Sequence, residues 1–216
     1  MQTKIIKVTA SDTSAINEAA DIIKSGGLVA FPTETVYGVG ANALDIEACQ
    51  KIYKIKGRPA NKALTLHVAN YEMIDSIAKI NSTAERLITK FLPGPLTLIL
   101  PKLESVPDFV TAGLNTVGIR MPDNDIALAL IKAANCPIAA PSANLSGQPS
   151  PTTAQEVLNN LSGKIPMILD GGSCKFGVSS TIVDLTKEEP VILRNGVIDK
   201  SALNIGENIG ENNGKT

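Results

Sequence analysis

The 216-residue sequence contains no tryptophan, three tyrosines, four phenylalanines and a single histidine, His67. Stacking surfaces for single-stranded nucleic acid are therefore scarce, because aromatic side chains build such surfaces. The formal net charge is −1, so the chain has no overall excess of positive charge for binding a polyanion. Any recognition of phosphate groups must come from a local cluster of cations.

The three cysteines, Cys49, Cys136 and Cys174, lie far apart, without a CxxC pair or a nearby histidine. This pattern favours buried free thiols in a reducing compartment over a metal site. No apolar run approaches the length of a membrane span, and the first twelve residues lack the apolar core of a signal peptide. We therefore expect no membrane association and a cytoplasmic location.

Helical and strand patterns alternate through most of the chain, which predicts an α/β fold. Helices are expected in TSAINEAADIIKSGG, DIEACQKIYKIKG, STAERLITKFL, DNDIALALIKAAN and TTAQEVLNNL, with Ser82 and Glu85 as a capping box. Strands are expected in LVAFPT, ALTLHV, LTLIL, TVGIRM, PIAAPS, MILD, STIVDL and PVILR. The last three leave little room for helices between them, so the sheet should be mixed. One domain, residues 1–202, should precede a polar tail, residues 203–216.

A basic run, KIYKIKGRPANKALTLHV, occupies residues 51–68. Its first two lysines suit the end of a helix, where cations interact favourably with the helix dipole. Lys56, Arg58 and Lys62 instead straddle a Gly-Arg-Pro turn, which favours a clamp for polyphosphate over solvated side chains. His67 follows in the next strand, and its residue type alone is compatible with a structural or a functional role.

Four other segments place polar groups where a ligand could bind. FPTETVYGVG brings hydroxyls to the end of a strand, although a capped turn is the alternative and the glycine spacing fits no nucleotide loop. Arg120, inside an apolar strand, needs a carboxylate or phosphate partner unless it faces solvent or pairs with a nearby acid such as Asp123. PIAAPSANLSGQPSPT offers small residues and hydroxyls before a helix, which favours anions. Arg194 interrupts the strand in VILRNG, where an exposed turn is the simpler interpretation.

A serine hydrolase is disfavoured, because the chain has no GxSxG segment and His67 would be its only possible base.

Six segments taken in order, from about residue 28 to residue 197, resemble the YrdC-type threonylcarbamoyl-AMP synthase family. They are PTETVYGVGANAL, KGRPANKAL, PGPLTLIL, VGIRMPDN, APSANLSGQPSPT and STIVDL…ILRNG. The resemblance implies a twisted, mostly mixed open sheet flanked by helices, with a concave basic cavity. It also implies condensation of L-threonine, bicarbonate and ATP to threonylcarbamoyl-AMP with release of pyrophosphate.

The resemblance further implies a role for each of a set of polar residues. ATP contacts are expected from Arg58, Lys62, Thr116, Ser142, Ser150 and Arg194, and threonine contacts from Thr35, His67, Arg120, Ala140 and Ser180. Lys56 and Arg58 form the KxR motif and are the expected catalytic cations. Lys62 stands where some relatives have asparagine, and Ala140 where relatives can carry a hydroxyl. No protein metal ligand is expected, and Mg²⁺ should bind mainly through ATP.

The product of this reaction feeds the N6-threonylcarbamoyl modification of adenosine in tRNA, so a downstream transferase complex is an expected partner. Longer relatives carry an additional C-terminal domain, and this chain is expected to match the short, single-domain form. Two alternatives remain. One is a module that binds double-stranded RNA or tRNA without catalysis, and weak RNA binding is also compatible with an enzyme. The other is a carbamoyltransferase domain that forms a carbamoyl-adenylate.

Overall fold

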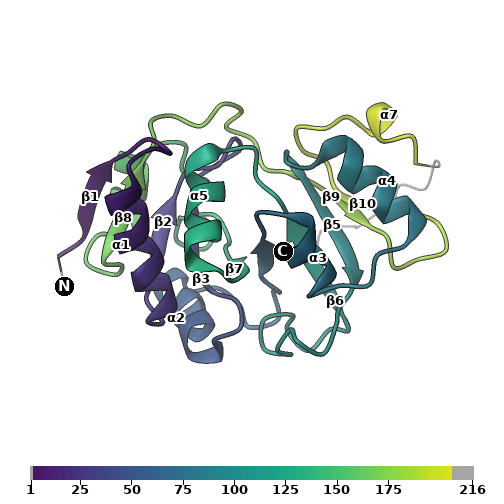
Figure 1. Ribbon diagram of the computed structural model, residues 1–216, viewed down its shortest axis with the longest axis horizontal. Coiled ribbons are helices and arrows are strands. Elements are labelled where there is room, and N and C mark those ends of the chain that lie inside the picture. Colours follow the sequence, from purple (N-terminus) through teal and green to yellow (C-terminus); the bar gives the residue numbers. More distant parts are fainter. Residues whose placement is uncertain (1, 206–216) are drawn as a thin grey trace.

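The computed structural model describes residues 2–205, in which ten strands form one sheet (Figure 1). The strands are β1 (Lys4–Lys7), β2 (Val29–Phe31), β3 (Gly38–Asn42), β4 (Thr65–His67), β5 (Leu96–Pro101), β6 (Thr116–Arg120), β7 (Ile138–Ala139), β8 (Met167–Asp170), β9 (Thr181–Asp184) and β10 (Val191–Arg194). The helices are α1 (Thr13–Lys24), α2 (Ile46–Lys56), α3 (Tyr71–Asp75), α4 (Ser82–Phe91), α5 (Asp125–Ala134), α6 (Ala154–Leu161) and α7 (Lys200–Leu203).

The sheet is mixed, as the sequence predicted. Its order is β1-β8-β2-β3-β7-β4-β6-β5-β9-β10. Among the described strands, β8 pairs in parallel with both β1 and β2, and β4–β6 and β5–β9 are also parallel. The pairs β2–β3, β3–β7, β4–β7, β5–β6 and β9–β10 are antiparallel. The expected α/β class with an open, mixed sheet is therefore confirmed.

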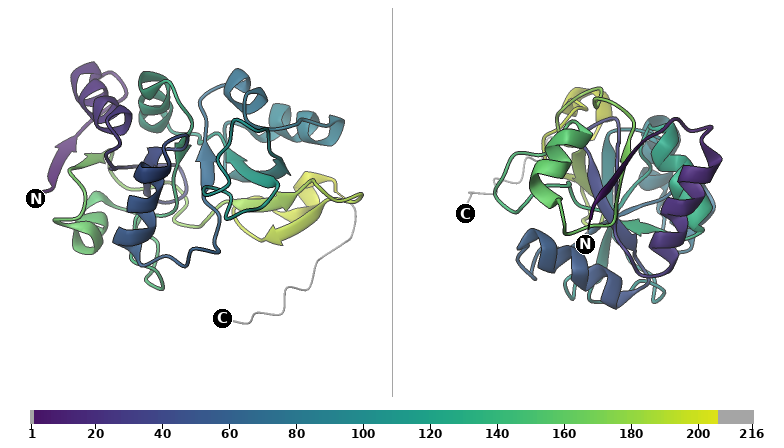
Figure 2. Two further views of the ribbon diagram at one scale, coloured as in Figure 1. Left: turned by 90° about the horizontal axis from the view of Figure 1, so that it is seen from below. Right: turned by 90° about the vertical axis from the view of Figure 1, so that its left-hand side faces the viewer.

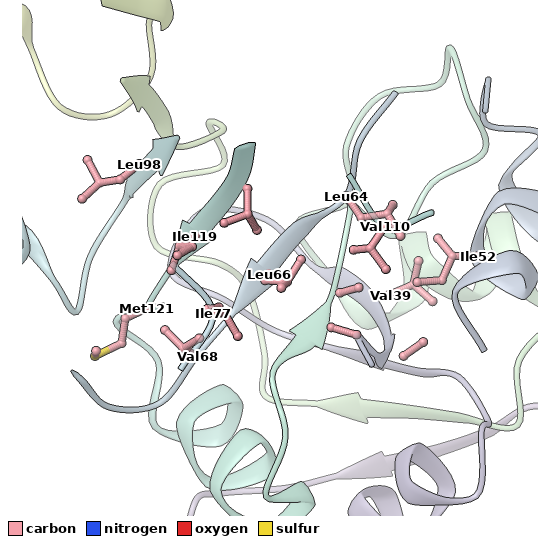
Figure 3. Close-up of a cluster of buried hydrophobic side chains, with 14 of the residues drawn as sticks. Val39, Ile52, Leu64, Leu66, Val68, Ile77, Leu98, Val110, Ile119 and Met121 are labelled. Atoms are coloured by element: carbon pink, nitrogen blue, oxygen red, sulfur yellow. The ribbon is translucent and has the colours of Figure 1, made fainter. Parts of the chain in front are cut away.

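Helices cover the two faces of the sheet, and a hydrophobic core lies on each face. Seen end-on, α1 and α5 lie on one side, and α2 and α6 lie on the other (Figure 2, right). The first core packs α1 and α5 against side chains of β2, β7 and β8. The second core lies on the opposite face and includes Leu66, Leu98 and Ile119 from the central strands, with Ile52 from α2 (Figure 3).

Helix starts follow local capping chemistry, and one of them differs from the prediction. Ser82 and Glu85 do not cap α4. Asn81 is the N-cap, and its Oδ1 accepts a hydrogen bond from the backbone N–H of Ala84 at 2.8 Å. Asparagine is at least as good an N-cap as serine, so the cap lies one residue before the predicted position and the helix begins at Ser82 itself. For α6, a capping box at Thr153 confirms the predicted start.

Four elements were not predicted. β1 and β3 are strands, and α3 and α7 are short helices. The expected tail begins within packed structure, because Leu203 and Ile205 are buried in the second core. Residues 206–216 lie outside the described residues. The division into a catalytic domain and a polar tail stays a prediction.

Candidate functional site

One cavity brings together hydroxyls and arginines that lie far apart in the sequence. None of its lining residues belongs to a helix. They are Thr33, Thr35, Val36, Tyr37, Gly38, Arg58, Thr65, His67, Thr97, Arg120, Ala140, Pro141, Ser142, Ser179, Ser180 and Arg194. The cavity therefore opens on strands and on the loops that leave them. Within residues 2–205 its lining holds three arginines and no carboxylate.

The cavity lies on the sheet face that α5 covers elsewhere. His67 on β4 stands opposite Ile138 on β7, and Ile138 packs in the core with α5. Residues directly opposite in a sheet share a face. His67 also pairs with Arg120 on β6, so both side chains belong to this face. Among the described residues, no helix contributes to the cavity lining on this part of the face, where the predicted site residues meet.

Most of the predicted site residues line this cavity. They are Thr35, Arg58, His67, Arg120, Ala140, Ser142, Ser180 and Arg194. Four others, Lys56, Lys62, Thr116 and Ser150, do not line it. The contacts expected from the resemblance are thereby grouped in one place, although the role of each residue stays a prediction.

Arg120 is buried and paired with a carboxylate, which decides between the alternatives left by the sequence. Its Nη2 lies 2.8 Å from Glu34 Oε2 and donates a hydrogen bond to Thr35 Oγ1 at 2.7 Å. The side chains of Arg120 and Glu34 are 7% and 2% exposed, so the pair is shielded from solvent. A solvent-facing arginine and a pairing with Asp123 are both wrong. The Nε of Arg120 has no hydrogen-bond partner among the described residues.

His67 is buried and neutral. Burial, together with the positive charge of Arg120, lowers the pKa of the imidazole from 6.5 to about 3. Its ring meets Phe31 edge to face, with centroids 6.2 Å apart. Nδ1 has no hydrogen-bond partner among the described residues. At neutral pH His67 can therefore offer a polar atom to a ligand but not a positive charge.

The two cations of the KxR motif have different surroundings. Arg58 lines the cavity and donates from Nε to Lys62 O at 3.1 Å and from Nη2 to Ala63 O at 2.7 Å. Lys56 is 3% exposed, and its Nζ donates to the backbone carbonyls of Ser142, at 2.5 Å, and of Asn144. Burial and the nearby Arg58 charge lower the pKa of Lys56 to about 8. Lys56 thus ties α2 to the loop that carries Ser142.

Arg194 and Ser180 form another part of the cavity wall. Arg194 donates from both Nε and Nη2 to Ser180 O, at 3.0 and 2.8 Å, and from Nη2 to Ser180 Oγ at 3.0 Å. Ser180 Oγ also lies 2.8 Å from Thr97 Oγ1. The tight-turn interpretation of the segment around Arg194 therefore missed a specific contact, because Ser180 lies fourteen residues away.

Three other predicted residues lie outside the lining, in β6 and in two loops. Lys62 is exposed, and its backbone carbonyl accepts hydrogen bonds from Arg58 and Tyr53. Thr116 lies on β6 four residues before Arg120, which places it on the same face of the strand. Ser150 is half-buried in the loop before α6.

Sequence reasoning assigned no ligand role to several polar residues of this site. Thr33, Thr65 and Thr97 line the cavity, and Glu34 lies behind it as the partner of Arg120. Glu34 stands between two threonines in PTET, but no pattern in the sequence indicates an arginine 86 positions later as its partner. The one available signal was the requirement that a buried arginine have a carboxylate partner.

Clusters of metal-binding side chains and membrane-spanning helices are both absent from the described residues. No cluster of three or more histidine, cysteine or acidic side chains suited to a metal ion occurs in residues 2–205. Over the same range, no helix combines the length and apolar character needed to cross a membrane.

Comparisons with known proteins place this cavity in context. The chain is 55% identical over 182 residues to the threonylcarbamoyl-AMP synthase of Pyrococcus abyssi, a match that covers 84% of this chain and 54% of that protein. It is 46% identical to the threonylcarbamoyl-AMP synthase of Bacillus subtilis, covering 94% of this chain and 61% of that protein. The chain thus spans little more than half the length of these relatives.

A solved structure shows the same fold. The crystal structure of Pyrococcus abyssi Sua5 complexed with L-threonine superposes with a TM-score of 0.87 at 51% identity, covering 91% of this chain and 58% of that one. A family model described as Sua5/YciO/YrdC, telomere recombination, matches residues 21–196. That match takes in β2 to β10 and every residue that lines the cavity. The chain therefore belongs to the Sua5/YciO/YrdC family.

Proposed function

We propose that the chain condenses L-threonine, bicarbonate and ATP to threonylcarbamoyl-AMP and pyrophosphate. The observation that carries the proposal is one cavity with a buried arginine, Arg120, at one part of its wall and two further arginines, Arg58 and Arg194, elsewhere in its lining. The relatives that are 55% and 46% identical to this chain are named threonylcarbamoyl-AMP synthase, and a structural neighbour was solved in complex with L-threonine.

The residues divide into two groups with different chemistry. Arg120 suits the carboxylate of an amino acid, because its guanidinium is positively charged and its Nε has no hydrogen-bond partner among the described residues. Thr35, His67, Ala140 and Ser180 complete the proposed threonine subsite. The proposed phosphate subsite is formed by Arg58, Ser142 and Arg194, with Lys62, Thr116 and Ser150 as further proposed contacts from outside the lining.

The proposed reaction needs no protein nucleophile. The amine of threonine and bicarbonate form a carbamate with loss of water. An oxygen of the carbamate then attacks the α-phosphorus of ATP, and pyrophosphate leaves. Catalysis is then mainly positioning and neutralisation of phosphate charge, for which fixed arginines are suited. Lys56 contributes by holding the Ser142 loop through two carbonyl contacts.

Mg²⁺ is proposed as the cofactor, bound mainly through ATP. The cavity lining supplies hydroxyls and guanidinium groups but no carboxylate among residues 2–205, which fits an ion held by phosphate oxygens. When bound, the ion would neutralise negative charge on the phosphates. The product is proposed to supply a threonylcarbamoyl-transferase complex that acts on tRNA in the cytoplasm.

The test is pyrophosphate release from ATP, with threonine and bicarbonate omitted in turn. We expect a requirement for both. Arg58→Ala should lose most of the activity while folding normally, and Lys54→Ala is the matched control, because Lys54 is an exposed cation in the last turn of α2, four residues before Arg58. Near-normal turnover in Arg58→Ala would show that the clamp is wrong.

The same assay separates the alternatives. RNA binding without threonine-dependent pyrophosphate release would favour an RNA-binding module. Pyrophosphate release that depends on carbamoyl phosphate, and not on threonine, would favour a carbamoyltransferase.

A further inference from the structure

A chain of buried hydrogen bonds runs behind the proposed threonine subsite. Arg120 Nη2 donates to Thr35 Oγ1 at 2.7 Å, and Thr35 Oγ1 lies 2.8 Å from Thr33 Oγ1. Thr33 Oγ1 in turn lies 2.7 Å from the backbone carbonyl oxygen of Val36. All three residues are at most 6% exposed, so this run of hydrogen bonds is buried.

The direction of each proton in this chain is fixed by its far end. A carbonyl oxygen can only accept, so the contact between Thr33 and Val36 requires the single hydroxyl proton of Thr33. Thr33 must then accept from Thr35, which uses the only hydroxyl proton of Thr35. The backbone N–H groups of Thr35 and Val36 also point to Thr33 Oγ1, both at 3.2 Å. A hydroxyl oxygen has two lone pairs, so these two longer contacts share one lone pair and the shorter contact from Thr35 Oγ1 uses the other.

The Thr35 hydroxyl can therefore accept one further hydrogen bond but cannot donate one. Its proton is used by Thr33, and one lone pair is used by Arg120. The remaining lone pair can accept a hydrogen bond, and Thr35 borders the cavity. Any polar contact between Thr35 and a ligand must come from a donor on the ligand. A carboxylate has no donor, so it is directed to Arg120.

Glu34 fixes the other end of the chain. It balances the buried charge of Arg120 as an ion pair, with Oε2 2.8 Å from Nη2, the atom that also bonds to Thr35, and neither Glu34 oxygen has a hydrogen-bond partner among the described residues. Arg58 and Arg194 are held in a different way, through neutral backbone carbonyls. Of the three arginines in the lining, Arg120 is the one that is paired with a carboxylate among the described residues. That carboxylate belongs to Glu34, which lies outside the cavity lining.

We propose that Thr33 and Glu34 are positioning residues that set the polarity of the amino-acid subsite. Glu34 orients Arg120 as the donor for the carboxylate, and Thr33 makes Thr35 an acceptor for the ammonium or the hydroxyl group of threonine. This inference rests on the proposed function, since it assigns the ends of the same substrate.

The experiment measures dissociation constants by calorimetry for L-threonine and for two analogues, each lacking one donor. 3-Hydroxybutanoate lacks the ammonium group, and 2-aminobutanoate lacks the hydroxyl group. The variants are Thr33→Val, which removes the hydroxyl at nearly constant shape, and Thr33→Ser, which keeps it. Thr111→Val is the matched control, because Thr111 is fully buried, donates to Leu114 O at 2.8 Å and lies outside the cavity lining.

For the wild type, we expect the analogue without the recognised donor to bind at least about tenfold more weakly than threonine. In Thr33→Val that difference should shrink to about threefold or less, while Thr33→Ser and Thr111→Val keep it. Such a cycle isolates the coupling between Thr33 and the donor, which a general loss of stability would not produce. An equal analogue preference in Thr33→Val and in the wild type would overturn the role of Thr33.

Glu34→Gln tests the other residue. We expect the threonine dissociation constant to rise about 10- to 100-fold, and that for ATP to change by about twofold or less. Should Glu34→Gln not fold, Glu34→Asp replaces it, with an expected rise of at least about threefold for threonine alone. An unchanged threonine affinity, or a parallel loss of ATP affinity, would overturn the role of Glu34. A wild type that binds no threonine would overturn the proposed function itself, whereas unaltered variants of an active wild type would overturn this inference only.

Discussion

The burial of His67 predicts how the stability of the protein depends on pH. The pKa of His67 is lowered to about 3 in the fold, against 6.5 for an exposed imidazole. Below pH 6.5 the unfolded chain therefore binds a proton that the folded chain does not bind until about pH 3. Stability is thus complete above pH 6.5 and falls as the pH decreases between these two values.

The magnitude follows from the unfolded pKa. Moving from about pH 7.5 to about pH 5 should lower the free energy of unfolding by about 2 kcal/mol through His67 alone. A folded pKa of about 4 in place of about 3 would barely change this figure, because the folded imidazole is neutral at pH 5 in both cases. The side chain is 4% exposed, so solvent screening does not reduce the effect.

The assay is urea denaturation of the wild type and of His67→Gln at both pH values. Other titrating groups are common to both proteins, so the difference between them isolates His67, which is the one histidine in the sequence. The free energy of unfolding of His67→Gln, relative to that of the wild type, should rise by about 2 kcal/mol between about pH 7.5 and about pH 5. Parallel pH dependence of the two proteins would refute the reasoning, as would an NMR titration that shows the imidazole of the folded wild type protonating near pH 6.5.

Three further substitutions test other parts of the structure. Lys56→Met should weaken ATP binding about tenfold or more, because the Ser142 loop loses its contact with the Lys56 ammonium. Stability should change little, because the substitution also removes a buried charge. Calorimetry would measure the affinity and thermal melts the stability. Gly40→Ala should cost about 1–3 kcal/mol in denaturation, since its new methyl group would lie 2.8 Å from Phe31 Cε1. Thr153→Ala should cost about 1 kcal/mol by loss of the capping box, with unchanged substrate affinity.

The helices were predictable because their signals are local. Periodic apolar residues and end signals in residues 13–24 and 46–56 lie within one segment, and the helices formed there. β3 was missed because its sequence, GVGAN, is rich in glycine, and its pairing with β2 and β7 supplies the stability. β1 was missed because KIIK is a four-residue edge strand flanked by lysines.

The sequence indicated which residues form the site better than it indicated the contacts between them. The six resembling segments led to eight residues that line one cavity. They did not indicate that the Lys56 ammonium binds two backbone carbonyls, or that Glu34 pairs with Arg120. Both contacts join residues 86 or more positions apart, and such partners are set by strand order and not by any local pattern.

The order of the strands also governs when the site comes into existence during synthesis. β2, near the start of the chain, is held between β3 and β8, and β5 is held between β6 and β9. A nascent chain that has reached α5 therefore lacks one of the two neighbours of each strand, namely β8 and β9. Ser180 and Arg194, on the last wall of the cavity, are added later still. The proposed threonine affinity would consequently be a property of the finished sheet, and ligand-dependent protection from proteolysis would report complete folding and not the collapse of either half.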